Sequence, residues 1–156
     1  MRLFTRVGAC VALIAMLGLV FATRSAAHEG REVANEQYHL IVGFLDEPAF
    51  VGEKNAMILQ VTKPVEAASP VAGGGEGEES ESVEPVEGLV GTLQAEVIYG
   101  DQRMTLELRP LVGEPGSYVG YFFPMAEGDY SFRVFGDIEG NAIDETFTSG
   151  PETFAA

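Results

Sequence analysis

The strongest constraint on the fold is a two-residue alternation of apolar and polar side chains that recurs along most of the chain. A period of two is that of a β-strand with one face buried. The pattern occupies seven short segments, residues 38–45, 57–61, 93–99, 104–108, 117–123, 129–136 and 142–148. Turn-forming Gly, Pro, Asn and Asp lie between them, and no amphipathic helical pattern follows residue 27. The chain is therefore predicted to be all-β.

Seven short strands with regular turn signals predict an immunoglobulin-like antiparallel β-sandwich, with a small closed barrel as the alternative. Residues 93–99 and 104–108 are expected to form a hairpin across Gly100-Asp101. By parity, Met57 and Met104 should point into the core. Tyr130 follows a turn that ends at Gly128, which suits a tyrosine corner, in which the hydroxyl binds nearby backbone.

One long segment interrupts the strands. Residues 64–88 are rich in Gly, Ser, Glu and Pro and contain few large apolar side chains. Such a composition buries too little apolar surface to offset the entropy lost on ordering. We predict a disordered acidic insertion within a single domain that spans residues 28–156.

The first 27 residues are typical of a secretory signal peptide. Arg2 and Arg6 flank the start of an apolar run, and Ser25 and Ala27 occupy the two small positions before a cut at His28. The run is short for a helix that crosses a bilayer. We therefore expect an exported domain, periplasmic or extracellular at the cell surface, with no stable membrane insertion after cleavage. The alternative is an uncleaved anchor.

The charge and the cysteine content exclude several classes of partner and site. Residues 28–156 contain all 24 acidic residues and six of the nine basic ones, a net charge of −18. Such a surface repels nucleic acid and anionic lipid. The one cysteine, Cys10, lies inside the predicted signal peptide. The domain is therefore expected to lack disulfides, thiolate metal sites and cysteine nucleophiles.

Two stretches carry a family resemblance. They are "EPAFVGEKNAMILQVTKPV" at 47–65 and "EPGSYVGYFFPMAEGDYSFRV" at 114–134. Over residues 37–136 the chain resembles the YtkA-like and CopC-like group of exported immunoglobulin-type domains. The resemblance implies copper handling by a mature N-terminal histidine that binds Cu(II) through its amine and its ring, here His28. The chain departs from the group in having no local His-x-His or Met-rich box and in its 64–88 insertion.

The chemistry of His28 agrees with this role. An N-terminal amine has a pKa of about 7.7–8.0 and an imidazole of about 6.5, so both can bind a metal near neutral pH. Cu(II) favours nitrogen and oxygen donors in a tetragonal arrangement. His39 could supply a third nitrogen. The alternative is an unstructured N-terminus with a solvated His28, and an unpartnered His39 on an outer sheet face.

Further donors are less specific. Glu29, Glu32 and Asp46 lie near the histidines in sequence and offer carboxylate oxygen. Met125, in a turn, is the one methionine we retain as a candidate ligand for Cu(I).

The sequence favours a binding protein over an enzyme. It contains no Gly-x-Ser-x-Gly elbow, phosphate-binding loop or His-Glu-x-x-His. We predict an exported copper-binding module, a carrier or buffer, with His28 and His39 as metal ligands. The alternatives are a non-metal interaction domain with a protein partner in the cell envelope, and a structural domain of a larger export assembly. No oligomeric state is predicted.

Overall fold

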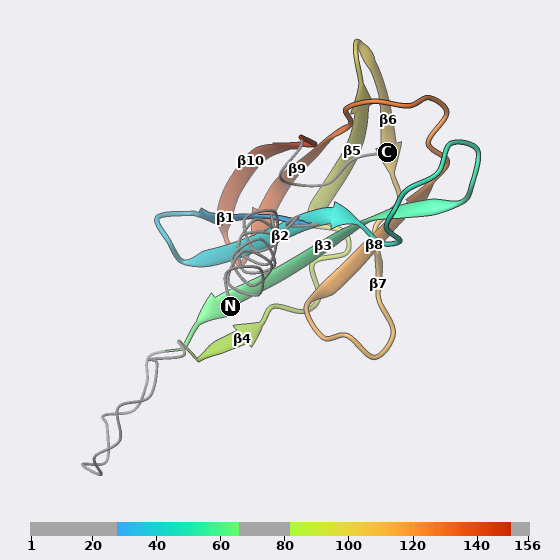
Figure 1. Cartoon of the computed structure of the whole chain (residues 1–156). Coiled ribbons are helices and arrows are strands. Elements are labelled where there is room, and N and C mark those ends of the chain that lie inside the picture. Colours follow the sequence, from blue (N-terminus) through green and yellow to red (C-terminus); the bar gives the residue numbers. More distant parts are fainter. Residues whose placement is uncertain (1–27, 66–81, 151–156) are drawn as a thin grey trace, which may run out of the picture.

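The computed structural model describes residues 28–65 and 82–150, which form two antiparallel β-sheets (Figure 1). The predicted signal peptide lies outside these residues. Within the two described ranges the chain contains no helix that is long and apolar enough to span a membrane. The ten strands are β1 (His28–Val33), β2 (Tyr38–Phe44), β3 (Asn55–Pro64), β4 (Val83–Pro85), β5 (Leu93–Tyr99), β6 (Gln102–Leu106), β7 (Arg109–Pro110), β8 (Ser117–Phe122), β9 (Ser131–Ile138) and β10 (Asn141–Thr148).

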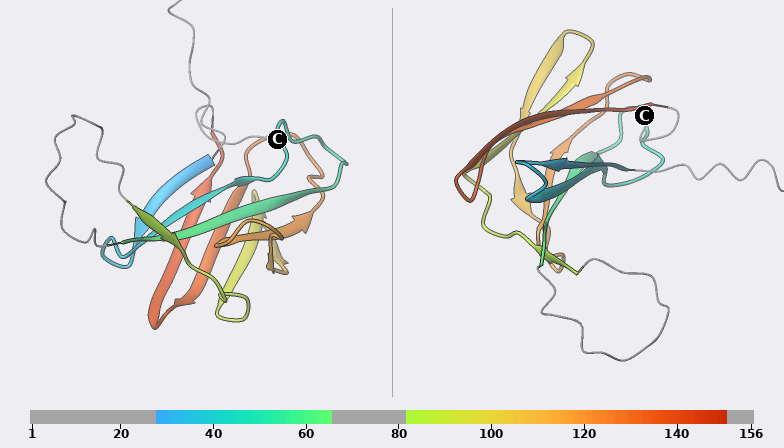
Figure 2. Two further views of the ribbon diagram at one scale, coloured as in Figure 1. Left: turned by 90° about the horizontal axis from the view of Figure 1, so that it is seen from below. Right: turned by 90° about the vertical axis from the view of Figure 1, so that its left-hand side faces the viewer.

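In the part of the chain that the structure describes, the two sheets are separate open layers and do not form the closed barrel (Figure 2). The larger sheet has six strands in the order β1-β2-β3-β8-β7, with β4 also paired to β3. The smaller sheet has the order β10-β9-β5-β6. The prediction of an all-β, antiparallel sandwich is confirmed. Three strands, β1, β4 and β7, were not expected, and two of them have only two or three residues.

The alternation places one face of each strand in a shared core. Phe44 of β2 lies at its centre, with its ring 5.4 Å from the ring of Phe132 and 5.9 Å from those of Phe122 and Tyr130. These rings come from both sheets, so their edge-to-face and stacked contacts join the two layers. Burial of these rings on one face of each strand explains the two-residue alternation of apolar and polar side chains in the sequence.

The two methionines that were predicted to point into the core differ in their exposure to solvent. Met57 is fully buried, as predicted. Met104 shares a face with the buried Val97 but is 48 % exposed, so the prediction is wrong for this residue. The reason is position, because the tip of the β5–β6 hairpin extends past the larger sheet, which therefore does not cover it (Figure 1).

The tyrosine corner is confirmed. The hydroxyl of Tyr130 donates to the carbonyl of Ala126 (2.8 Å) and accepts the N–H groups of Met125 (3.1 Å) and Ala126 (3.2 Å). These bonds fix the crossover from β8 in one sheet to β9 in the other. The predicted hairpin is also present, with Tyr99 paired to Gln102 across Gly100-Asp101.

Parts of the predicted 64–88 insertion belong to strands, since Pro64 ends β3. Residues 83–85 form β4, in which Pro85 pairs with Thr62 of β3. Val86 is 2 % exposed, and its N–H donates to the carbonyl of Val61. The prediction of disorder is therefore wrong for this part, because one valine in a polar stretch is enough to anchor it to the core. Residues 66–81 lie outside the described residues.

Candidate functional site

The two histidines lie on the same outer face of the larger sheet. His28 begins β1 opposite Gly43, and His39 in β2 lies opposite Glu32. Residues that are opposite in an antiparallel pair, and those two positions away, share a face. The N-terminal segment is therefore not unstructured, since His28–Val33 form an edge strand. His39 points outward, as predicted, but from a strand that lies between β1 and β3.

The ring of His39 lies over Gly30, between the two histidines. The backbones of His28 and His39 are offset by four residues of strand, about 13 Å. However, a Cβ added to Gly30 would lie 2.9 Å from Nε2 of His39 and 3.3 Å from its Cε1. Gly30 is only two residues, roughly 7 Å, from His28. The absent side chain at position 30 thus lets the imidazole of His39 lean toward His28.

Both histidines line one shallow hollow. Its other walls are apolar or uncharged, and they come from three neighbouring strands and the residue after β2: Gly30, Ile41, Leu45, Ile58 and Gln60. Half-buried aliphatic side chains beside imidazoles leave few competing polar groups. Any carboxylate donor must therefore come from the margin of this hollow, because none of the described carboxylates lines it.

Of the two predicted carboxylate donors in β1, only Glu32 faces the same side as the histidines. Glu32 and Glu36 line a second hollow on the other side of His39. Glu29 faces the opposite side, where its carboxylate binds the guanidinium of Arg31 (2.6 Å) and the N–H of Thr148 (3.2 Å). Glu29 is therefore committed to the fold.

The loop after β2 contains one predicted donor and one that the sequence did not indicate. Asp46 is exposed, and its backbone is held by the Asn55 side chain in bonds of 3.1 and 2.8 Å. Glu47 follows it. Burial raises the pKa of the Glu47 carboxyl, and the nearby charge of His28 partly offsets this. Glu47 thus lies within electrostatic range of His28, a proximity created by loop geometry that no motif signals.

Side chains alone do not complete a metal centre. Among residues 28–65 and 82–150, no three His, Cys, Asp or Glu side chains are grouped so that they could hold a metal ion. The described side chains supply two imidazoles on one face, with carboxylates at the margins. The remaining nitrogen that the sequence predicted is the α-amine of His28, which is free only when the chain begins there.

The exposed methionines lie elsewhere. Met125 is 78 % exposed and, with Met104, lines a hollow at the β5–β6 hairpin. Its walls include the rings of Tyr99, Phe122 and Phe123. This hollow shares no residue with the one that His28 and His39 line. The structure therefore does not bring Met125 to the predicted copper ligands.

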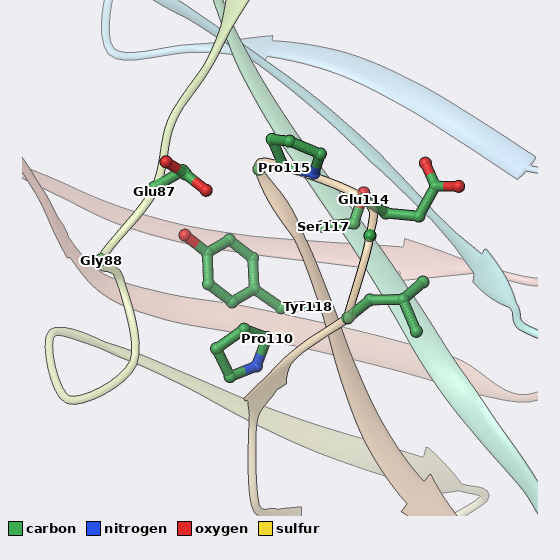
Figure 3. A pocket seen from close by; sticks show the side chains of 10 residues that line it. Glu87, Gly88, Pro110, Glu114, Pro115, Ser117 and Tyr118 are labelled. Carbon is green, nitrogen blue, oxygen red and sulfur yellow. The ribbon is translucent and has the colours of Figure 1, made fainter.

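A fourth hollow lies between the β7–β8 turn and the segment before β5 (Figure 3). Its wall includes Tyr118, whose hydroxyl donates to the carbonyl of Val86 (2.8 Å) and accepts the N–H of Leu89 (3.3 Å). Both bonds are internal, and Pro110 and Pro115 supply much of the remaining wall. Tyr118 thus anchors the chain that leads into β5.

In comparisons with known proteins, no family model, curated sequence or solved structure matches this chain.

Proposed function

We propose that this protein is an exported copper-binding module, a carrier or buffer, in which His28 and His39 of an immunoglobulin-type sandwich bind Cu(II). The observation that carries the proposal is the ring of His39 lying over Gly30, two residues from His28. Both side chains line the same hollow. Export, cleavage before His28 and the immunoglobulin-type topology are parts of the same proposal.

The donor set suits Cu(II) when the chain begins at His28. The α-amine and the ring of one histidine form a chelate, and His39 adds a third nitrogen. Cu(II) prefers such nitrogen-rich, tetragonal surroundings. Glu47 or Glu32 could supply a carboxylate oxygen at the margin, and this negative charge favours a divalent cation.

The location suits transfer of the metal rather than catalysis on it. The hollow lies on an outer sheet face, with His28 exposed and His39 half-buried. Cargo there is accessible to a donor or acceptor protein. An overall net charge of −18 over residues 28–156 attracts cations to the surface.

The test is a competition titration with a chelator of known Cu(II) affinity at fixed pH. Four proteins are compared: the chain beginning at His28, the same chain with one extra residue in front, His28→Ala and His39→Ala. The extra residue moves the free amine away from His28 while it keeps both imidazoles. Intact-mass measurement of the exported protein establishes the natural first residue.

We expect the chain that begins at His28 to bind most tightly. The extended chain and His28→Ala should both bind weakly, and His39→Ala should lose less. Acid should release copper, because only the neutral amine and imidazole bind it. Equal binding by all four proteins would assign the copper to the general acidic surface and would refute the proposal.

A second candidate function is an interaction domain. The observation that favours it is the group of exposed apolar side chains around the β5–β6 hairpin, Tyr99, Met104, Phe123 and Met125. Clustered exposed apolar residues mark binding surfaces more often than isolated ones do.

A further inference from the structure

The β5–β6 hairpin has an outer edge along β6. Among the described residues, β6 is the outermost strand of the smaller sheet and pairs with β5 only. The hairpin extends beyond the rest of the sandwich, so this edge lies at the outside of the molecule (Figures 1 and 2). Gln102, Arg103, Met104 and Thr105 are all exposed. An exposed edge strand is a template for pairing with another strand.

The hairpin turn determines which backbone groups are free. Tyr99 pairs with Gln102 across a two-residue turn in which Gly100 has a φ of 58°. Such a turn is closed by a hydrogen-bonded pair, after which bonded and non-bonded pairs alternate. Met104 therefore bonds to Val97 of β5. Arg103 and Thr105 direct their N–H and C=O groups outward, to the free edge.

The inner face beside this edge is apolar. Met104 lies there and lines the hollow with Phe123 and Met125, which are 54 % and 78 % exposed. A strand that pairs with β6 would therefore also cover apolar surface, which adds to the stabilisation from backbone hydrogen bonds.

Basic as well as acidic side chains lie near this edge, although the chain is strongly acidic. Three of the six basic residues beyond position 27 are Arg103, Arg109 and Arg133. Arg103 and Arg133 both contact Glu96, at 3.6 and 3.3 Å, and Arg109 pairs with Glu107 at 3.1 Å. These cations offset part of the negative charge that two copies of this acidic chain would bring together at the edge.

We propose that β6 pairs antiparallel with β6 of a second copy, with the two-fold axis at Met104. In this register Arg103 forms a hydrogen-bonded pair with Thr105 of the second copy, and the reverse pair follows by symmetry. The outward N–H and C=O groups of Arg103 and Thr105 are then all hydrogen-bonded to the second copy. The two four-stranded sheets become one continuous sheet, and the Met104 side chains meet on its apolar face.

The fit to a second copy distinguishes it from a foreign strand. Only Arg103 and Thr105 direct backbone hydrogen-bonding groups to the free edge of β6. The two-fold pairing uses both residues on each chain. A longer partner strand would gain no further backbone hydrogen bonds from this short edge. The dimer does not involve the hollow that His28 and His39 line, so it does not depend on the proposed copper function.

The first test is sedimentation velocity of the exported protein over a wide concentration range. Thr105→Pro removes an outward N–H that makes no bond to β5, so the monomer should fold while the dimer is lost. Thr105→Val keeps the N–H and is the matched control. Circular dichroism checks that each variant is folded. We expect the wild-type protein and Thr105→Val to dimerise, and Thr105→Pro to remain monomeric.

The second test fixes the register by cross-linking. Residues in a non-hydrogen-bonded antiparallel pair have Cα atoms about 4.5 Å apart, within the range that a disulfide spans. In a Cys10→Ser background, Met104→Cys should therefore form a disulfide-linked dimer on mild oxidation. Val112→Cys is the control, since Val112 is 96 % exposed and lies outside β6. Equal cross-linking of both variants would overturn the register.

A wild-type protein that is monomeric at every concentration would overturn the proposal and would leave this edge to a strand of another protein or to none. Dimerisation that Thr105→Pro does not weaken would also overturn it, because the contact would then lie elsewhere.

Discussion

Arg31 of β1 and Glu145 of β10 form an ion pair that joins the edges of the two sheets. One guanidinium nitrogen lies 2.7 Å from Oε2 of Glu145 and also donates to the carbonyl of Thr146 (3.2 Å). The other binds Glu29 at 2.6 Å, and the guanidinium lies 4.7 Å from the centre of the Phe147 ring. Within residues 28–65 and 82–150, β1 pairs only with β2, so these contacts attach an edge strand, and with it His28, to the opposite layer.

Arg31→Leu should therefore loosen β1. Both partners are about one-third exposed, so we expect a loss of only about 1 kcal/mol in the free energy of unfolding. Amide hydrogen exchange is the more sensitive measurement, and the amides of residues 29–33 should exchange faster. Arg31→Lys keeps the charge but loses the planar guanidinium. Its amide exchange rates should therefore lie between those of the wild-type protein and Arg31→Leu. Unchanged exchange in Arg31→Leu would show that pairing with β2 alone holds the strand.

The tyrosine corner gives a second prediction. Tyr130→Phe removes one acceptor for two backbone N–H groups and one donor to a carbonyl. We expect a loss of about 1 kcal/mol or more in the free energy of unfolding, from chemical denaturation at neutral pH. The ring contacts with Phe44 and Tyr99 should persist, so the fold should not change. An unchanged denaturation midpoint would show that water replaces these bonds without cost.

Periodicity predicted the central strands well but could not indicate β1. Its inward positions include Glu29 and Arg31, which pair with one another and with β10 instead of entering the apolar core. Charged residues that satisfy each other at a sheet edge do not produce an alternation of apolar and polar residues. Only the three-dimensional arrangement reveals that segment 28–33 is a strand.

The candidate site was predictable in its residue types but not in its geometry. Parity places His39 on an outer face, but the pairing register is needed to place His28 on the same face. The role of Gly30 and the proximity of Glu47 follow from close approach and loop shape, for which sequence has no signal. Met104 shows the same limit, since parity predicts the face of a strand and not whether another layer covers it.

Alkaline pH should destabilise the protein through its buried tyrosines. Burial raises the pKa of Tyr118, and burial with the Glu139 contact raises that of Tyr38. A raised pKa in the folded state contributes stability that is complete below the unfolded value, about 10, and is lost as pH rises through the folded value. The denaturant concentration at the unfolding midpoint should therefore decrease as the pH rises above about 10. Tyr118→Phe should reduce this fall, whereas Tyr121→Phe, at an exposed position, should not.

The position of Gly30 gives a prediction specific to the proposed copper site. Gly30→Ala would place a Cβ 2.9 Å from Nε2 of His39, a contact that real Cβ atoms do not make, so the imidazole must move. Because Nε2 is the free end of a rotatable side chain, the sheet should remain intact and the denaturation midpoint nearly unchanged. Copper affinity in the competition titration should fall about tenfold, as when a group that orients a metal ligand is lost. In a His39→Ala background the same substitution should have no further effect. An equal loss in that background would show that Gly30→Ala acts through the β1 backbone, and His39 would not be the ligand that leans toward His28.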